Sequence, residues 1–227
     1  MIVLGIESAT DKCSVALAEG QNVFQVERTS PIGHSQVVLD LVKEVLDESG
    51  ISLESVELLA ADVGPGSFTG LRVGLGVAKA LAYGRRLPVV GFTSLEILAV
   101  QGDSGLVVPA LDARMNEVYV AVYELTGDDR PVMLEPARVC APGDVSLPAS
   151  RKFLGLGSGW DRYGGAMVEP IDAGIHCLSG RTPEARDLVH LARQTNAAEW
   201  SRAVDLEAAY IRDQVVQAPK SPVNPNR

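Results

Sequence analysis

Cysteine and histidine are scarce in this sequence, with three of each, and neither residue type falls into a recognisable metal-binding spacing. Cys13, Cys140 and Cys177 form no C-x-x-C pair, which indicates neither a disulfide framework nor a zinc knuckle. The histidines form no H-x-x-x-H or H-E-x-x-H motif, so a zincin-like peptidase site is not expected. The sequence therefore predicts no metal site, and its cysteine usage suits a reducing cytoplasm.

Positive charge is also in short supply, because 20 lysines and arginines face 29 acidic residues and the formal net charge is −9. Such a chain repels nucleic-acid phosphates and anionic membranes, so direct binding of nucleic acid is disfavoured. Long hydrophobic runs are missing too: the most apolar stretch, 71–82, includes Arg72 and Lys79 and is too short to span a bilayer. The beginning, "MIVLGIES", has no basic region, and we expect neither a signal peptide nor a membrane segment.

The first hundred residues contain a regular series of strand and helix signals. Apolar runs predict strands at 2–8, 13–19, 22–28, 57–63 and 88–92. Apolar residues at helical spacing predict helices at 35–49, 70–83 and 94–100. Three consecutive strands followed by alternating helices and strands build a mixed five-stranded sheet with helices on its faces. This order is the topology of the ribonuclease H and actin-like ATPase group, and we expect one such lobe at 1–102.

After the polar break "QGDSG" the strand pattern starts again, at 106–111, 117–125, 131–140 and 152–156. Only one helix is clearly indicated in this half, at 182–196, where Thr182 and Pro183 begin it. We therefore expect an α/β protein with a duplicated actin-like fold whose second lobe, 103–216, is truncated. The proline-rich tail 217–227 is expected to be disordered.

The stretch "VGPGSFTGLRVG" (63–74) carries the most distinctive glycine pattern. It matches neither the Walker A loop, because Leu71 follows Gly70 where lysine is needed, nor the Rossmann fingerprint, because Thr69 takes the place of the third glycine. A strand-to-helix turn is one interpretation, with Gly64 and Gly66 permitting positive φ and Ser67 or Thr69 capping the helix. The other is an anion site formed by Gly64, Gly66, Ser67 and Thr69 at the positive end of the helix.

The helix that follows has small residues every four positions, at Gly70, Gly74, Ala78 and Ala82. A strip without large side chains lets another backbone come close. Two interpretations stay open: packing on the chain's own sheet, or a helix pair within the chain or between chains.

Two acidic residues, Glu7 and Asp62, end strands that this topology brings together at their carboxyl ends. With Glu44 or Glu48 they would form a carboxylate cluster of the two-metal nuclease type. The alternative is that Glu44 and Glu48 lie on the solvated face of their helix. Elsewhere, "GLGSGW" (155–160) places Ser158 in a turn, and Asp112 and Arg114 suit a hairpin turn with an ion pair or a turn cap.

Six segments together resemble one family: "GPGSFTGLRVG", "LGIESATDKCSVAL", "GHSQVVLDLV", "PVVGFTSLEILA", "LDARMNEVY" and "AYIRDQV". They are similar to the bacterial TsaB (YeaZ) family of tRNA threonylcarbamoyladenosine biosynthesis proteins, from about Ile2 to Val215. The resemblance implies an accessory subunit that dimerises with a catalytic TsaD-type subunit and activates it to modify the adenosine beside the tRNA anticodon. It also implies a TsaE-type ATPase as a partner, a homodimer when alone, and only indirect contact with tRNA.

The catalytic relatives carry an H-x-x-x-H metal motif in a segment similar to "GVNHLEGH", and here the matching segment is "GFTSLEIL". Ser94 and Leu98 then stand in place of the two histidines, and leucine cannot bind a metal. The loop "ESATDKCS" also lacks the paired glycines with which nucleotide-using relatives approach phosphates. The resemblance therefore implies a chain that is not an enzyme and binds no cofactor alone, with ATP or ADP only in the complex. Alternatives are a glycoprotease-type metallopeptidase or a ribonuclease H-like nuclease.

The same resemblance suggests that the helices at 35–49 and 70–83 carry the contact with another chain. The residues expected there are Val38, Leu41, Val42, Val45, Gly70, Arg72, Gly74, Leu75 and Ala78.

Overall fold

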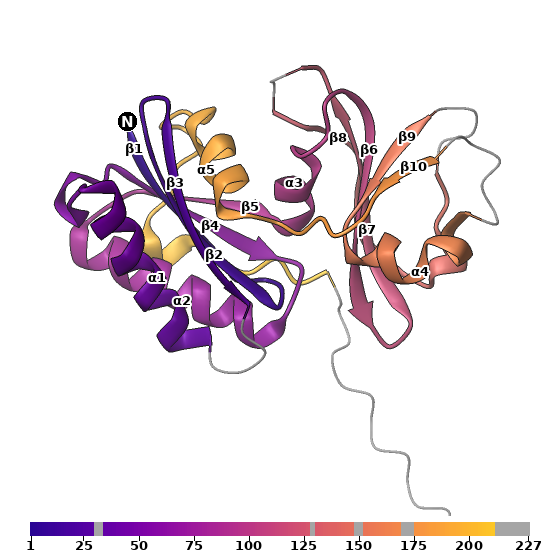
Figure 1. The fold of residues 1–227 in the computed structure, drawn as a ribbon, viewed down its shortest axis with the longest axis horizontal. Coiled ribbons are helices and arrows are strands. Elements are labelled where there is room, and N and C mark those ends of the chain that lie inside the picture. The colour runs from indigo at the N-terminus through magenta and orange to yellow at the C-terminus, as the bar shows by residue number, and fades with distance from the viewer. Residues whose placement is uncertain (30–33, 128–129, 148–151, 169–174, 212–227) are drawn as a thin grey trace, which may run out of the picture.

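The computed structural model describes residues 1–29, 34–127, 130–147, 152–168 and 175–211. Within them the chain folds into two five-stranded mixed sheets that lie side by side (Figure 1). The predicted fold class is confirmed. The expected disordered tail, 217–227, lies outside the described residues.

The first sheet has the strand order β3-β2-β1-β4-β5, in which β1 pairs antiparallel with β2 and parallel with β4. Its strands are β1 (Ile2–Glu7), β2 (Lys12–Glu19), β3 (Asn22–Thr29), β4 (Leu58–Gly64) and β5 (Val89–Thr93). The helices between them are α1 (His34–Ser49), the short 3-10 helix η1 (Leu53–Ser55), α2 (Phe68–Arg85) and α3 (Ser94–Ala99). Each predicted strand and helix of this half is present, with ends that differ by two residues or fewer.

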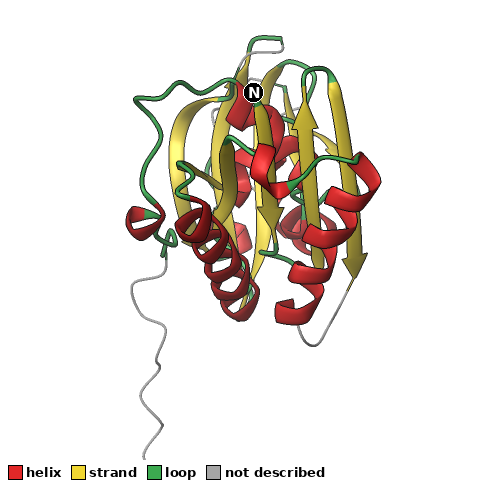
Figure 2. Cartoon of the chain, turned by 90° about the vertical axis from the view of Figure 1, so that its left-hand side faces the viewer, coloured by secondary structure: helices red, strands yellow, loops and turns green. Residues whose placement is uncertain are grey.

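Both faces of the first sheet are covered by helices, as Figures 1 and 2 show. One face packs against α1 and α2 through a core that includes Leu4, Ile6 and Leu41. The other packs against α3 and α5 (Ala185–Arg193) through Val3, Ala60 and neighbouring side chains. Because β4 is buried on both faces, its sequence is a nearly continuous apolar run.

The second sheet repeats this topology in the order β8-β7-β6-β9-β10. Its elements are β6 (Gly105–Arg114), β7 (Glu117–Leu125), β8 (Val132–Cys140), the 3-10 helix η2 (Pro142–Asp144), β9 (Phe153–Leu156), α4 (Ser158–Val168) and β10 (Ile175–Leu178). Neither α4 nor β10 was expected from the sequence. The four residues of β10 give too short a signal, and Gly159, Gly164 and Gly165 lower the helix propensity of α4.

The helix α5 lies within 103–216, the range expected to form the second lobe, but it does not pack on the second sheet. It returns to the first sheet, where its apolar stripe Leu188, Val189 and Ala192 joins the core beneath β1. Gly5 in β1 makes room for this, because a Cβ there would lie 2.6 Å from Val189 Cγ1 and 3.3 Å from Ala185 O. The chain then passes the edge strand β5, where Ser201 pairs with Val89, and the 3-10 helix η3 (Ala203–Asp205) adds Ala203 to the core on the opposite face, under α1 and α2.

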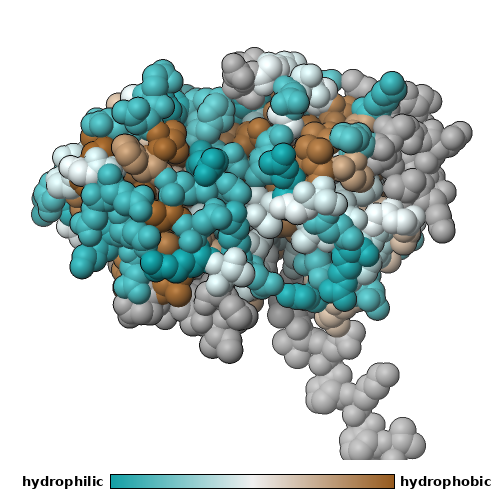
Figure 3. All heavy atoms as spheres, in the orientation of Figure 1, coloured by the Kyte–Doolittle hydropathy of each residue, from teal (hydrophilic) through white to brown (hydrophobic). Residues whose placement is uncertain are grey.

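The surface seen in Figure 3 is mainly hydrophilic, with apolar side chains in scattered groups. Among the described helices none combines the length and the apolar character needed to cross a membrane.

Candidate functional site

The glycine-rich turn leads from β4 into α2 and packs against the loop after β1. Gly64 takes a positive φ of 99°, and its peptide bond to Pro65 is cis. Gly66 was expected to need a positive φ as well, and it does not. It is required for another reason: a Cβ at Gly66 would overlap the carbonyl of Ala9, and Ser67 N donates a hydrogen bond of 2.6 Å to that same oxygen.

Ser67 is the N-cap of α2, and its hydroxyl accepts a hydrogen bond from Gly70 N at 3.3 Å. The prediction of a capped strand-to-helix turn is confirmed at this residue. Thr69, the other candidate cap, lies exposed in the first turn of the helix. The anion site at Gly64, Gly66, Ser67 and Thr69 stays a prediction, although the amide and hydroxyl of Ser67 are already bonded within the chain.

The small-residue strip of α2 faces the end of β1. A Cβ at Gly70 would overlap the carbonyl oxygen of Ser8, and one at Gly74 would overlap the Ser8 hydroxyl. That hydroxyl donates to Gly70 O at 2.9 Å. The strip therefore packs the helix on its own sheet, which is the first of the two interpretations that the sequence left open.

Eight of the nine residues expected at a contact with another chain are buried inside the lobe, and Arg72 alone is exposed. The expectation for the eight is corrected, because the apolar faces of α1 and α2 that it named are the faces that cover the sheet. The outward face of α2 is formed by Phe68, Arg72, Gly76, Ala80 and Tyr83. Arg72 lies over the Phe68 ring, with 3.8 Å between the guanidinium carbon and the ring centroid.

Glu7 and Asp62 meet at the carboxyl ends of β1 and β4, as the topology predicted, and their side chains are 0% and 3% exposed. Glu7 accepts from Ala9 N at 2.7 Å, while Asp62 Oδ1 accepts from Gly64 N and from the Ser94 hydroxyl, both at 2.7 Å. Among the described residues, the second oxygen of Asp62, Oδ2, has no hydrogen-bond partner, and it is buried.

Burial raises the pKa of Glu7 well above its ordinary value, and the neighbouring carboxylate of Asp62 adds to the rise. Burial likewise raises the pKa of Asp62, to about 7, against the hydrogen bonds from Gly64 and Ser94. A pair of carboxyl groups sealed from water in this way favours a bound proton.

Glu44 and Glu48 do not join this pair. Glu44 forms an ion pair with Arg28 at 2.5 Å, and Glu48 lies exposed on α1, where both border a shallow charged hollow. The alternative of a solvated helix face is the one that the structure supports. Among the described residues, no group of three or more histidines, cysteines or acidic residues is arranged to hold a metal ion.

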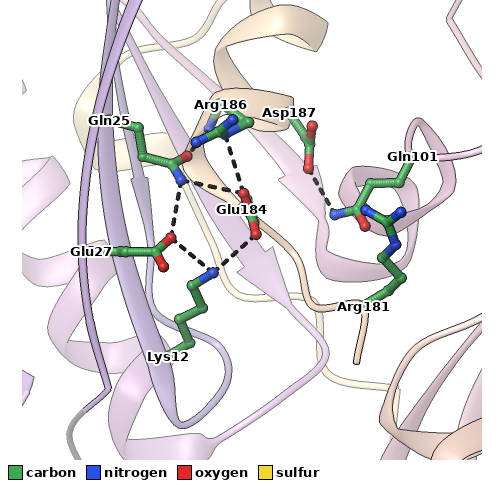
Figure 4. Close-up of a pocket in the computed structure, with 8 residues that line it drawn as sticks. All are labelled: Lys12, Gln25, Glu27, Gln101, Arg181, Glu184, Arg186 and Asp187. Carbon is green, nitrogen blue, oxygen red and sulfur yellow. Dashed lines mark hydrogen bonds and ion pairs between the residues drawn. The ribbon is translucent and has the colours of Figure 1, made fainter. Parts of the chain in front are cut away.

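A polar pocket of about 390 Å³ lies where the beginning of α5 meets β2 and β3 (Figure 4). No sequence motif predicted this pocket. Its lining residues are Lys12, Gln25, Glu27, Gln101, Arg181, Glu184, Arg186 and Asp187.

Most of these side chains bind one another across the pocket. Lys12 forms ion pairs with Glu27 at 2.8 Å and with Glu184 at 2.9 Å, and Gln25 donates to Glu184 at 3.2 Å. The amide of Arg186, in the first turn of α5, donates to Gln25 Oε1 at 2.8 Å. Charges and helix amides that could bind a ligand are thus used to attach α5 to the sheet. Lys12 and Glu184 are 172 positions apart, so local spacing gives no signal of this pairing.

Similarity to known proteins agrees with this architecture. The family model described as TsaD, tRNA N6-adenosine threonylcarbamoyltransferase, matches residues 28–152. The tRNA threonylcarbamoyladenosine biosynthesis protein TsaB of Escherichia coli (strain K12) is 33% identical, over 95% of this chain and 96% of that protein. The chain belongs to the TsaB family. A Pseudomonas aeruginosa crystal structure described as similar to peptidase YEAZ has a TM-score of 0.85 and 32% identity, covering 93% of this chain and 99% of that one.

A tRNA N6-adenosine threonylcarbamoyltransferase of Syntrophobacter fumaroxidans is 30% identical over 77% of this chain and 56% of that protein. This member of the TsaB family thus spans little more than half of that relative. Of the two residues expected from the resemblance to replace histidines, Ser94 donates its hydroxyl to Asp62 and Leu98 lies buried in the core between α3 and the second sheet. Both side chains have structural partners in this chain.

The second lobe contains a counterpart of the glycine-rich turn. Gly157, with φ 105°, connects β9 to α4. Ser158, which was expected in the turn itself, is the first residue of that helix. The Ser158 hydroxyl accepts from Asp112 N at 3.1 Å. Asp112 also pairs with Arg162 at 2.8 Å and with Arg114 at 3.6 Å, so the predicted ion pair is confirmed.

Proposed function

We propose that the chain is an accessory subunit in the synthesis of threonylcarbamoyladenosine in tRNA, and that it pairs with a TsaD-type catalytic subunit and activates it. The observation that carries this proposal is the similarity to TsaB over nearly the whole length of both chains. The family model of the catalytic relative matches residues 28–152, as expected of two related subunits.

A non-catalytic role is supported by the surroundings of the residues that were considered as possible metal ligands or their replacements. Ser94 and Leu98 are buried and packed, and Glu7 and Asp62 are sealed from water with raised pKa values. Neither pair lies open to a substrate. These features count against the metallopeptidase and nuclease alternatives, both of which need accessible metal ligands.

The proposed contact with the catalytic subunit is the outward face of α2, beside the exposed part of α1. On α2 the small residues Gly76 and Ala80 lie exposed between Arg72 and Tyr83, and Leu39 on α1 is 48% exposed. A helix from another chain packs closely against such a surface. The same face would form a homodimer when the chain is alone, and a TsaE-type ATPase and ATP or ADP would join only the complex. We place this assembly in the cytoplasm, with tRNA contacted through the other subunits.

Reconstitution tests the function. The TsaD-type and TsaE-type subunits of the same organism are incubated with tRNA and threonylcarbamoyl-adenylate, with and without this chain, and the modified nucleoside is measured by mass spectrometry. We expect modification only when the chain is present, and no modification by the chain alone. Equal modification without it would refute the proposal.

The contact face is tested with Gly76→Leu. No atom of the described residues lies within 4 Å of a Cβ at this position, so the variant should fold normally while its side chain obstructs a partner helix. The control is Gly143→Leu in the second lobe, where the surroundings are equally open. We expect size-exclusion chromatography to show loss of the complex for Gly76→Leu only. An unchanged complex would show that the contact lies elsewhere on the chain, and it would not affect the conclusion from the reconstitution.

A further inference from the structure

Arg130, just before the edge strand β8 of the second sheet, contacts three residues from two segments of the chain with one guanidinium group. Its Nε donates to Glu96 Oε1 at 3.0 Å, and one terminal nitrogen donates to Glu199 Oε2 at 2.5 Å. Its guanidinium carbon also lies 4.9 Å from the centroid of the Phe92 ring, which is a cation–π distance.

The three partners belong to the first sheet or adjoin it. Phe92 lies in β5, and Glu96 lies in α3, which follows β5 directly. Glu199 belongs to the segment after α5, where Ser201 exchanges two backbone hydrogen bonds with Val89 of β5. Arg130 therefore joins the edge of one sheet to three elements at the border of the other.

The arrangement is partly shielded from water, which favours a lasting interaction over a transient surface pair. The side chain of Glu96 is 14% exposed, and those of Arg130 and Glu199 are 36% and 37% exposed. The planar guanidinium group of Arg130 has two carboxylate acceptors and an aromatic ring as partners. It therefore makes more favourable contacts than the arginine of an isolated, exposed ion pair.

The helix α3 lies between the two sheets and supplies the apolar part of the same junction (Figure 1). Leu95 and Leu98 pack into the core of the second sheet, while Ile97 packs into the core of the first. The hydroxyls of Thr93 and Tyr123, from β5 and β7, lie 3.5 Å apart across the junction. The space in which a two-lobed protein could open is thus occupied by packed side chains.

We propose that Arg130 is a latch that fixes the two lobes at one angle. The chain is then a rigid support for its partners and does not open and close about a hinge. This role rests on the junction alone and holds whether or not the proposed tRNA-modification function is correct.

Hydrogen–deuterium exchange of the whole chain tests the latch with Arg130→Met, which keeps a long unbranched side chain and removes the guanidinium group with its charge. We expect amides in the joined segments, 94–97, 132–135 and 199–201, to exchange about tenfold faster. Arg202→Met is the control, since Arg202 pairs only with the nearby Asp205 among the described residues and should leave these amides unchanged.

Two results would overturn the latch. One is unchanged exchange in the three segments, and the other is equal acceleration throughout both sheets, which would mean that Arg130 contributes only to general stability. If Arg130→Met does not fold, Glu199→Gln is measured in its place. This substitution removes one of the two ion pairs of Arg130 at a partly exposed site. A smaller local acceleration in that variant supports the latch, and no change at 199–201 refutes it.

Discussion

The two lobes share one strand order but differ in what covers them. In the first lobe, α1 lies between β3 and β4, and both faces of the sheet are buried under helices. In the second, the described residues between β8 and β9 contain only η2, and Val132, Met133 and Leu134 of β8 remain 55%, 50% and 43% exposed. The first lobe therefore has the more complete core, completed by α5 from the far end of the chain.

The strand-to-helix turn, by contrast, is retained in both lobes. In the first, Gly66 and Gly70 allow the start of α2 to approach Ala9 and Ser8 after β1; in the second, Gly157 allows the start of α4 to approach Ala110 in β6. In both lobes, then, the backbone at the start of a helix lies close to the backbone at the end of a strand. The comparison teaches that a glycine-rich motif with a phosphate-loop appearance can be a packing device.

The largest effect is expected for Gly157→Ala in the second lobe. The substitution combines a φ of 105° with a Cβ that overlaps Ala110 O, so we expect a loss of about 4 kcal/mol in unfolding free energy. Urea denaturation measures it. The matched control is Gly165→Ala in α4, where the glycine is exposed and no atom of the described part of the chain lies within 4 Å of an added Cβ; it should be stabilising by about 0.5–1 kcal/mol. Equal values for the two variants would contradict the packing role.

The corresponding change in the first lobe, Gly70→Ala, should cost about 3 kcal/mol. Its added Cβ overlaps the Ser8 carbonyl but introduces no positive-φ strain. Gly76→Ala, on the outward face of the same helix, is expected to be mildly stabilising. If Gly70→Ala leaves stability unchanged while weakening a complex, the strip would serve a partner and our interpretation of the comparison would fail.

The elements of the first lobe could be predicted from the sequence more completely than those of the second, because they give stronger local signals. The continuous apolar run of β4 and the helical stripe of α1 identified their elements, and topology brought Glu7 to Asp62. The amphipathic stripe of α5 showed that one face is buried, but no local pattern states which sheet buries it. The same limit applies to Arg130 and Glu199, whose contact depends on how the lobes are placed.

The buried carboxyl pair distinguishes the first lobe further, because its counterpart at the end of β6, Asp112, is ion-paired with the exposed Arg162. In Asp62 the pKa rises from 3.8 to about 7 on folding, so the folded chain binds a proton that the unfolded chain releases. The resulting stability is fully present below about pH 4 and is lost as the pH rises to about 7.

We therefore expect Asp62→Asn to remove part of this pH dependence. The fall in unfolding free energy between pH 5 and pH 8 should shrink by roughly 2 kcal/mol relative to the unmodified chain. Thermal and urea denaturation across this range measure it. Asp47→Asn, exposed on α1, is the control. A parallel pH profile for Asp62→Asn and the unmodified chain would show that Asp62 binds no proton on folding.

The smallest effect concerns the attachment of α5 to the first lobe. Glu184 is approached by Lys12 and Arg186, and although burial alone would raise its pKa, hydrogen bonds from Lys12 and Gln25 lower it below its ordinary value. This contribution is present at neutral pH and lost as the pH falls through the acidic range. Glu184→Gln should cost about 1 kcal/mol at low ionic strength and less in high salt.

Hydrogen exchange shows where that loss falls. Because α5 forms part of the core beneath β1, its amides should exchange faster in Glu184→Gln while α4 in the second lobe stays protected. Asp205→Asn removes a local pair with Arg202 and should leave α5 unchanged. Faster exchange in α4 with α5 unaffected would assign the helix to the second lobe after all. Faster exchange in α5 alone would confirm that the chain completes its first core with a segment that follows the second.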